Sequence, residues 1–313
     1  MSTAQSTAVV MLGKPVADEI NARLLRQVPE FTAKHKIVPN LAIVQVGYNA
    51  ASERYIAKKI EACAKLKMHA ELKAFPEAIS ADDLKEEVAR LSRSSEFHGV
   101  LVQLPLPREI EEHYTAGTNK FDIFDVIPPE KDVDGVGHDA IASLYRAQPD
   151  RMIMLPGTAL AVRRIMAHYK VQTEGKVAVI VGRNDITSKP MMLMLGGRMC
   201  NAAAIWVHRH VDMEEQKTLI RQADIIVTAV GNAAYQITSD MVKPGAAIFD
   251  VATRVDSHGK LHGDVDFPAV QHVASAITPV PRGVGPVTVA ALTENLLRAA
   301  KFAAGVGEYG YSF

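Results

Sequence analysis

The sequence contains little cysteine and few aromatic residues. Its 313 residues include two cysteines, Cys63 and Cys200, one tryptophan, and only 6% aromatic side chains in all. Two isolated cysteines provide neither a disulfide framework nor the paired spacing of a zinc site, and such scarcity is typical of a reducing compartment. We therefore expect an apolar core to hold the fold together, because a chain of this length can bury a large one.

The sequence also has no excess of charge of one sign and no long hydrophobic run. Lys+Arg 35 balance Asp+Glu 35, and no basic stripe appears, which argues against a nucleic-acid partner. No apolar run is long enough to span a bilayer, and the N-terminal residues lack the basic and apolar segments of a secretory signal. With 48% hydrophobic and 22% charged residues, the composition is typical of globular proteins. We expect a cytoplasmic protein without a membrane partner.

Short apolar runs alternate with helical patterns along the chain. Runs of strand length lie at 41–47, 99–107, 176–184, 202–210, 223–231 and 245–253. Helical patterns lie at 14–33, 52–68, 81–92, 158–169 and 287–304. This alternation predicts βαβ units, and therefore an α/β fold with mostly parallel sheets.

The length and a turn-rich stretch at 149–158 predict two domains that flank a cleft. Residues 11–152 form the first, an α/β catalytic domain. Residues 153–285 form a Rossmann-like parallel-sheet nucleotide domain, because their apolar runs are continuous, as in strands buried on both faces. The final helix is expected to return to the first domain, which then includes residues 286–313 and is discontinuous. The first ten residues are expected to form a loose tail.

The predicted helix at 52–68 carries the first candidate residues. Ser52 stands where an N-cap belongs, and Tyr55 and Lys59 share one helix face because they are four residues apart. A phenol beside an amine can orient a substrate nitrogen or activate water, and a lysine in a closed cleft can act as a base. The same spacing occurs in ordinary amphipathic helices, and Lys58 is an alternative to Lys59.

Polar side chains also end two other segments of the first domain. Gln103 precedes a proline-rich loop and needs hydrogen-bond partners if it is buried. Asp132 and Asp134 alternate before Gly135, where they either bind the N–H edge of a heterocycle or cap their own turn. A calcium loop is disfavoured because its further ligands are missing.

A glycine turn opens the predicted nucleotide site. Gly182, Arg183 and Asn184 follow a clear strand, and Ser188 precedes a helical run, so that a helix N-terminus faces the turn. The full G-x-G-x-x-G fingerprint is absent. Arg183 and Arg209 lie just past two neighbouring strands, where two guanidinium groups can clamp a phosphate.

Two further segments complete the candidate features. His208 and His210 are two residues apart without supporting carboxylates, so we expect no metal there. The loop TPVPRGVGPVT, residues 278–288, contains three prolines and two glycines. This composition predicts a stiff cleft wall that a ligand can approach closely.

Together and in this order, these segments resemble the bifunctional methylenetetrahydrofolate dehydrogenase/cyclohydrolase family. The likeness runs from Lys14 to Ala303. It rests on VGYNAASERYIAKKIEAC, VQLPLP, PEKDVDG, the Gly182-Arg183 turn, GDVDF at 263–267 and TPVPRGVGPVT.

The resemblance implies oxidation of 5,10-methylenetetrahydrofolate with NADP, or alternatively NAD, and hydrolysis of the methenyl product to 10-formyltetrahydrofolate. It implies that Lys59 is the catalytic group of the hydrolysis and that Gln103 is hydrogen-bonded to it. Tyr55 would stack on the folate, and Asp134 would bind the pterin, with Asp132 as the alternative. The other implied substrate contacts are Ser52, Pro281 and Gly283. A homodimer is implied as well.

The implied cofactor contacts are Thr158, Gly182, Arg183, Asn184, Ser188, Arg209, Val230, Gly231 and Thr288. An arginine at position 209 resembles NAD-using mitochondrial relatives, in which it helps to bind inorganic phosphate. Together with Arg183 it can equally hold the 2′-phosphate of NADP, which is the expectation adopted here.

The cofactor side departs from the family's usual pattern. Gly157 replaces a cysteine, Asn184 a serine, Ser188 and Ala252 each a glycine, and Arg282 a glycine at the cleft wall. A side chain at Ser188 is expected to stand where backbone approaches a pyrophosphate. Three alternatives remain open: a bifunctional enzyme, a cyclohydrolase that has lost efficient hydride transfer, and a folate- or nucleotide-binding protein without turnover.

Overall fold

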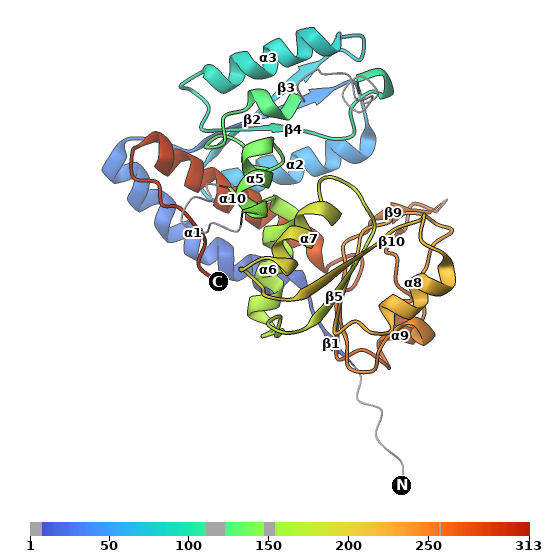
Figure 1. Cartoon of the computed structure of the whole chain (residues 1–313). Helices are drawn as coiled ribbons and strands as arrows, with labels where there is room; N and C mark the ends of the chain where they lie inside the picture. Colours follow the sequence, from blue (N-terminus) through green and yellow to red (C-terminus); the bar gives the residue numbers. More distant parts are fainter. Residues whose placement is uncertain (1–7, 111–122, 147–153, 257) are drawn as a thin grey trace.

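The structure is a computed structural model, and it describes residues 8–110, 123–146, 154–256 and 258–313 (Figure 1). The first part of the chain contains β1 (Val9–Val10), α1 (Gly13–His35), β2 (Asn40–Val46), α2 (Ala50–Lys65), β3 (His69–Phe75), α3 (Ala81–Arg93), β4 (Gly99–Val102), η1 (Ile123–Val126) and α5 (His138–Tyr145). The second contains α6 (Gly157–His168), β5 (Val177–Val181), α7 (Ser188–Gly196), β6 (Ala203–Val207), α8 (Met213–Ile220), β7 (Ile225–Thr228), η3 (Ser239–Met241), β8 (Ala247–Asp250), β9 (Arg254–Val255), β10 (Leu261–His262), α9 (Phe267–Val270), β11 (Ala276–Ile277) and α10 (Val284–Ala303).

The smaller sheet belongs to the first part of the chain and has the parallel order β3-β2-β4. Every residue of the central strand β2 is buried, as its continuous apolar run predicts. The predicted strand at 99–107 is too long, because β4 ends at Val102. Pro105 and Pro107 follow closely, and prolines cannot donate to a sheet ladder.

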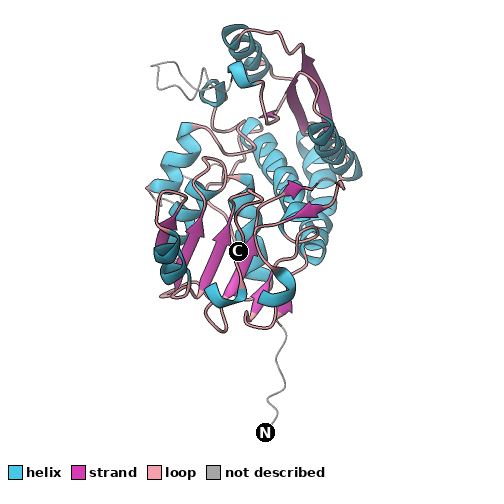
Figure 2. Cartoon of the chain, turned by 90° about the vertical axis from the view of Figure 1, so that its right-hand side faces the viewer, coloured by secondary structure: helices cyan, strands magenta, loops and turns pink. Residues whose placement is uncertain are grey.

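The larger sheet has the parallel order β1-β11-β8-β7-β5-β6, with helices flanking it (Figure 2). Its core strands agree with the predicted nucleotide domain. The expectation of a loose N-terminal tail is wrong for Val9 and Val10, which pair in parallel with Ala276 and Ile277. The reason is that backbone hydrogen bonds hold this two-residue strand, and its side chains are largely exposed, so no periodic pattern marks it.

Helix α10 runs back from the larger sheet to the first part of the chain (Figure 1). It packs against α1, α6 and α2 and also contacts β2 and β4. A half-buried ion-pair network joins three helices, because Glu294 of α10 pairs with Arg23 of α1 and Arg164 of α6. No helix among the described residues is long and apolar enough to cross a membrane.

Candidate active site

Helix α2 presents Tyr55 and Lys59 on one face, as their spacing predicts. The orientation of the helix about its axis is fixed by Ile56 and Cys63 and by Leu66, just after its last residue. These side chains are 2%, 0% and 2% exposed. These residues follow the helical repeat and pack into the core, so the opposite face cannot turn inward. Tyr55 is 40% exposed, whereas Lys59 is partly buried.

The N-terminus of α2 is capped differently from the prediction. The helix begins at Ala50, and Oδ1 of Asn49 accepts a hydrogen bond from the Ser52 backbone N–H at 3.0 Å. Ser52 is therefore in the first turn and is not the N-cap, because an asparagine three residues earlier takes that position. The buried Ser52 hydroxyl donates to the Leu104 carbonyl at 3.3 Å, which ties the helix to the loop after β4.

Lys59 and Gln103 meet between the helix and that loop. Lys59 Nζ donates to Gln103 Oε1 at 2.9 Å, and Gln103 Nε2 donates to the Leu104 carbonyl at 2.7 Å. Burial lowers the pKa of Lys59, and the negative charge of Asp134 opposes this in part. A lysine with a lowered pKa is neutral more often and can accept a proton. The competing Lys58 is exposed and lies over the Tyr55 ring, 5.6 Å from its centroid.

The two aspartates of the PEKDVDG segment have different surroundings. Asp132 is 2% exposed, and its carboxylate accepts backbone hydrogen bonds from Gly135 at 2.9 Å and Gly137 at 2.8 Å. Burial raises the pKa of Asp132 to about 7. Asp132 therefore caps its own turn, and the carboxylate that acts on Lys59 is Asp134.

Gly157 lies directly against Asp134. Its backbone N–H donates to the Asp134 carbonyl at 3.0 Å, and a Cβ at this glycine would lie 3.2 Å from Oδ1 of Asp134. The absent side chain thus lets the first turn of α6 approach the carboxylate closely.

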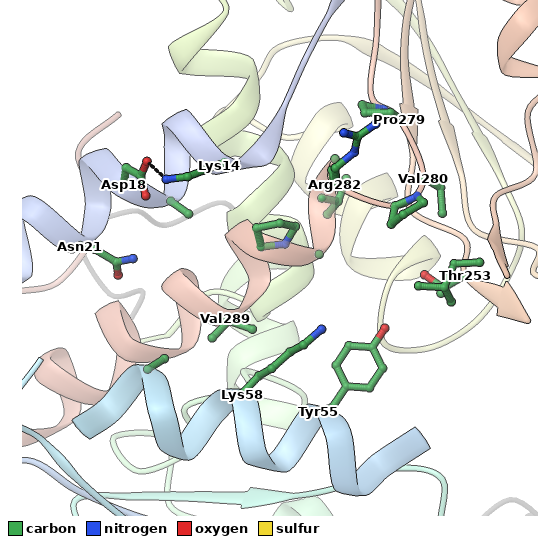
Figure 3. A pocket seen from close by; sticks show the side chains of 18 of the residues that line it. Lys14, Asp18, Asn21, Tyr55, Lys58, Thr253, Pro279, Val280, Arg282 and Val289 are labelled. Atoms are coloured by element: carbon green, nitrogen blue, oxygen red, sulfur yellow. Dashed lines mark hydrogen bonds and ion pairs between the residues drawn. The ribbon is translucent and has the colours of Figure 1, made fainter. Parts of the chain in front are cut away.

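A cavity of ≈ 630 Å³ opens between α1, α2 and two loops of the larger-sheet half. Tyr55 and Lys58 extend toward it from α2, and Val280 and Arg282 lie on the opposite wall (Figure 3). Pro281 and Gly283 also line this cavity, as expected for a cleft wall, but Ser52, Lys59, Gln103 and Asp134 do not.

The cleft wall is closely packed around Arg282. This residue has a φ of 85°, and its carbonyl accepts a hydrogen bond from Gly13 N–H at 2.8 Å. A Cβ at Gly283 would lie 2.5 Å from the Pro279 carbonyl oxygen, so only glycine fits there. The wall is therefore pinned to the start of α1.

The glycine turn follows β5, beside the neighbouring strand β6. Gly182 has a φ of 120°, and a Cβ there would lie 2.8 Å from both the Ala229 carbonyl oxygen and Ser188 Oγ. Ser188 is 0% exposed, and its hydroxyl has no hydrogen-bond partner among the described residues. The expectation that this side chain stands on the approach surface is therefore wrong, because it points inward beneath Gly182.

The side chain of Asn184 is hydrogen-bonded to backbone N–H groups at the start of α7. Its Oδ1 accepts from the backbone N–H groups of Thr187 at 2.6 Å and Ser188 at 3.2 Å. Its Nδ2 donates to the Ala229 carbonyl at 3.0 Å. Two N–H groups that would otherwise face an anion are thus already bound to the protein.

Arg183 and Arg209 are exposed at the ends of β5 and β6, in agreement with their predicted places on neighbouring strands. Neither guanidinium group forms an ion pair with a described residue, and Arg209 Nε donates to His210 Nε2 at 3.5 Å. Thr158 and Thr288 lie in the first turns of α6 and α10, and both are partly exposed.

Two buried carboxylates support the loop at Val230 and Gly231, which the sequence reasoning did not foresee. Asp264 accepts from Thr228 Oγ1 at 2.6 Å and from the N–H groups of Val230 at 2.7 Å and Gly231 at 2.9 Å. Asp250 in turn accepts from Asp264 N–H at 3.1 Å. Burial raises the pKa of Asp250 to about 7. Aspartates inside otherwise apolar segments are the signal that marks such capping groups.

His208 and His210 face each other with ring centroids 5.9 Å apart. No group of three potential metal ligands occurs within the described part of the chain.

Two family models match the chain. The tetrahydrofolate dehydrogenase/cyclohydrolase catalytic domain matches residues 11–134, and the NAD(P)-binding domain of the same family matches residues 156–304.

Similar proteins cover almost the whole chain. The bifunctional protein FolD of Enterococcus faecalis is 36% identical over 94% of this chain and 99% of its own length. The solved structure of the bifunctional FolD enzyme of Campylobacter jejuni has a TM-score of 0.85 and 33% identity, covering 94% of this chain and 99% of that one. The Trypanosoma brucei methylenetetrahydrofolate dehydrogenase-cyclohydrolase, solved with NADP and an inhibitor, has a TM-score of 0.86 and 31% identity, covering 95% and 98%.

Proposed function

The chain belongs to the tetrahydrofolate dehydrogenase/cyclohydrolase family, and from this premise we propose that it oxidises 5,10-methylenetetrahydrofolate with NADP and hydrolyses the product. The product of the first step is 5,10-methenyltetrahydrofolate, and hydrolysis gives 10-formyltetrahydrofolate. The observation that carries this proposal is the partly buried Lys59, which is hydrogen-bonded to Gln103 and whose pKa is affected by the charge of Asp134. Binding alone has no need of a lysine with a lowered pKa.

Lys59 performs the proton transfers of the hydrolysis. Its neutral amine takes a proton from water as the water oxygen bonds to the methenyl carbon. The same proton then goes to the ring nitrogen whose bond to that carbon breaks. The remaining hydroxyl proton leaves to solvent as the carbonyl of the formyl group forms on the other nitrogen. Gln103 holds the amine in place through its 2.9 Å hydrogen bond.

The remaining folate contacts orient the substrate for both steps. The exposed Tyr55 ring stacks on the folate, Asp134 binds the N–H edge of the pterin, and Pro281 and Gly283 form the facing wall. Ser52 acts by tying α2 to the loop of Gln103. Orienting the substrate against these groups lowers the barrier by proximity.

The residues present fit a dinucleotide. Gly182 gives a close backbone approach, two exposed arginines stand at adjacent strand ends, and Gly231 is exposed on a loop fixed from below. We assign binding to these groups together with Thr158, Asn184, Ser188, Val230 and Thr288, although Asn184 and Ser188 act through the turn they shape. When bound, NADP accepts the hydride released from the methylene carbon.

The proposal is tested by following cofactor reduction in purified protein with 5,10-methylenetetrahydrofolate, using NADP and NAD in parallel. We expect reduction of NADP and subsequent formation of 10-formyltetrahydrofolate. Hydrolysis of added methenyl substrate without reduction would show a cyclohydrolase that has lost hydride transfer. Binding of folate and nucleotide without either reaction would contradict the enzyme assignment.

The preference for NADP rests on Arg183 and Arg209. Arg209→Ser is predicted to weaken NADP binding about tenfold while NAD binding changes little, because it removes a forked contact to the extra phosphate. Arg198→Ser, an exposed arginine at the other end of α7, is the matched control. Equal losses for NADP and NAD would contradict the arginine clamp, and isothermal titration calorimetry measures both.

The same proposal includes three further assignments: the domain bounds, the oligomeric state and the cellular location. The folate-binding catalytic domain comprises 11–152 with 286–313, which is supported by the packing of α10 on α1 and α2, and 153–285 form the nucleotide domain. A homodimer is supported by the family resemblance, and a cytoplasmic location by the two isolated cysteines, whose scarcity is typical of a reducing compartment. Light scattering of the purified protein distinguishes a dimer from a monomer.

A further inference from the structure

The last residues of the chain fold back onto the loop before α6. The Tyr311 hydroxyl accepts a hydrogen bond from the Leu155 backbone N–H at 2.9 Å and donates to Asn295 Oδ1 at 2.7 Å. The ring of Tyr311 also stacks with the guanidinium of Arg298, 4.4 Å from its centroid. One phenol therefore satisfies two groups that are themselves inside the protein.

Asn295 carries this contact on to a second loop. It is 0% exposed, and its Nδ2 donates to the carbonyls of Val133 at 2.8 Å and Leu155 at 3.1 Å. Val133 and Leu155 are 0% exposed as well. The amide of Asn295 thus joins two chain segments, 133–135 and 155–157, that are distant in sequence.

These two segments pack against each other without spare room. Gly135 has a φ of 67°, and a Cβ there would lie 2.6 Å from the backbone nitrogen of Pro156. The backbone carbonyl of the neighbouring Asp134 accepts a hydrogen bond from Gly157 N–H at 3.0 Å. Neither of two closely packed segments can move without the other. The position of Asp134 therefore depends on both segments.

We propose that Tyr311 is a positioning residue for Asp134, acting through Asn295 on the backbone that carries the carboxylate. This inference rests on the proposed function, because it takes Asp134 as the folate-binding carboxylate beside Lys59. Without the hydroxyl, the Leu155 N–H and Asn295 Oδ1 lose their partners inside the protein. The amide of Asn295 then turns toward other partners and releases Val133 and Leu155, so Asp134 moves relative to Lys59.

The test is Tyr311→Phe, which keeps the ring and removes only the hydroxyl. We expect KM for 5,10-methenyltetrahydrofolate hydrolysis, and the Kd for the same folate, to rise about tenfold, while NADP affinity stays unchanged. The lower limb of the pH–rate profile should also move to lower pH, because Asp134 raises the pKa of Lys59 and would do so less. Tyr309→Phe is the matched control, since Tyr309 is 57% exposed and its ring pairs with that of the nearby Phe302.

A second variant changes Asn295, the residue through which Tyr311 acts on the backbone. Asn295→Ser should raise KM in the same way, and the double variant should lose no more than the larger single loss, because both residues act in series. This variant also keeps the inference testable if Tyr311→Phe folds poorly.

Three results would overturn the inference. The first is an unchanged KM and pH profile in folded Tyr311→Phe, and the second is an equal change in Tyr309→Phe. The third is a lower content of active protein with normal KM, which shows a purely structural role. If the wild-type protein neither binds nor converts the folate, the proposed function fails too, whereas an active wild type with an unaffected variant removes only Tyr311.

Discussion

Gly157 shows how the absence of a side chain sets the distance between α6 and the carboxylate of Asp134. The carboxylate lies where a Cβ at position 157 would approach Oδ1 to 3.2 Å, which is tighter than ordinary van der Waals contact. The glycine begins α6, where an alanine would favour the helix by up to about 1 kcal/mol, the value for a helix interior. Helix propensity and carboxylate position therefore favour different residues at this position.

We predict that Gly157→Ala raises KM for the folate substrate severalfold, because the new methyl group displaces Asp134 by a few tenths of an ångström. The free energy of unfolding should stay within about 1 kcal/mol of the wild type, since the gain in helix propensity offsets the crowding. Steady-state kinetics and thermal unfolding measure the two effects. A wild-type KM would show that Asp134 does not contact the substrate.

Individual residues were predictable to different degrees. The shared face of Tyr55 and Lys59 follows from helical geometry alone. The cap of α2 does not, because Asn49 and Ser52 are both good N-cap residues and only the backbone decides between them. The family resemblance favoured Asp134 with Asp132 as the alternative, and the structure shows that the Asp132 carboxylate is hydrogen-bonded to its own turn.

At the scale of elements, the loop at Val230 and Gly231, which we propose binds the nucleotide, depends on the buried carboxylate of Asp264. Asp264 accepts three hydrogen bonds, two of them from the loop residues Val230 and Gly231. A carboxylate offers acceptors only, which suits a cluster of N–H and O–H donors. The loop is therefore held in one shape before a nucleotide arrives.

We predict that Asp264→Asn weakens NADP binding about tenfold or more and leaves methenyltetrahydrofolate hydrolysis near the wild-type rate. An amide presents a donor to at least one of the three donors, and each unsatisfied buried group costs about 1–3 kcal/mol. Asp266→Asn is the matched control, because Asp266 caps α9 and does not contact the loop. Loss of hydrolysis together with NADP binding would show that the two halves do not act separately.

Elements with strong patterns were predictable, and weak edge elements were not. The buried runs of β2, β5, β7 and β8 carry continuous apolar sequence. Strand β3 reads HAELKAF and none of its residues is fully buried, so its hydrogen bonds to β2 decide its structure. The pairing of β1 with β11 joins residues far apart in sequence, which no local signal reveals.

At the scale of the whole molecule, burial of carboxylates makes stability depend on pH. Burial raises the pKa of Asp132 to about 7 from an ordinary value of 3.8. The folded protein therefore holds a proton that the unfolded chain has already released between these two values. In this window the contribution of Asp132 to the free energy of unfolding falls as the pH rises, and above about 7 it stays constant.

We predict that Asp132→Asn removes part of this slope. Between pH 4 and 7 the wild type should lose stability relative to the variant by on the order of a few kcal/mol. Urea unfolding at several pH values measures the difference. Parallel stability curves for the two proteins would show that Asp132 titrates normally in the folded state.

The central claim for the whole molecule is that α2 and the loop after β4 together place one partly buried lysine, Lys59, at the folate. The most direct measurement compares the rate of 5,10-methenyltetrahydrofolate hydrolysis in Lys59→Met and Lys58→Met. We predict that Lys59→Met loses at least about 100-fold in rate, with folate binding and thermal unfolding near the wild type, while Lys58→Met stays active. Wild-type hydrolysis by Lys59→Met, or loss of activity in Lys58→Met alone, would contradict the account.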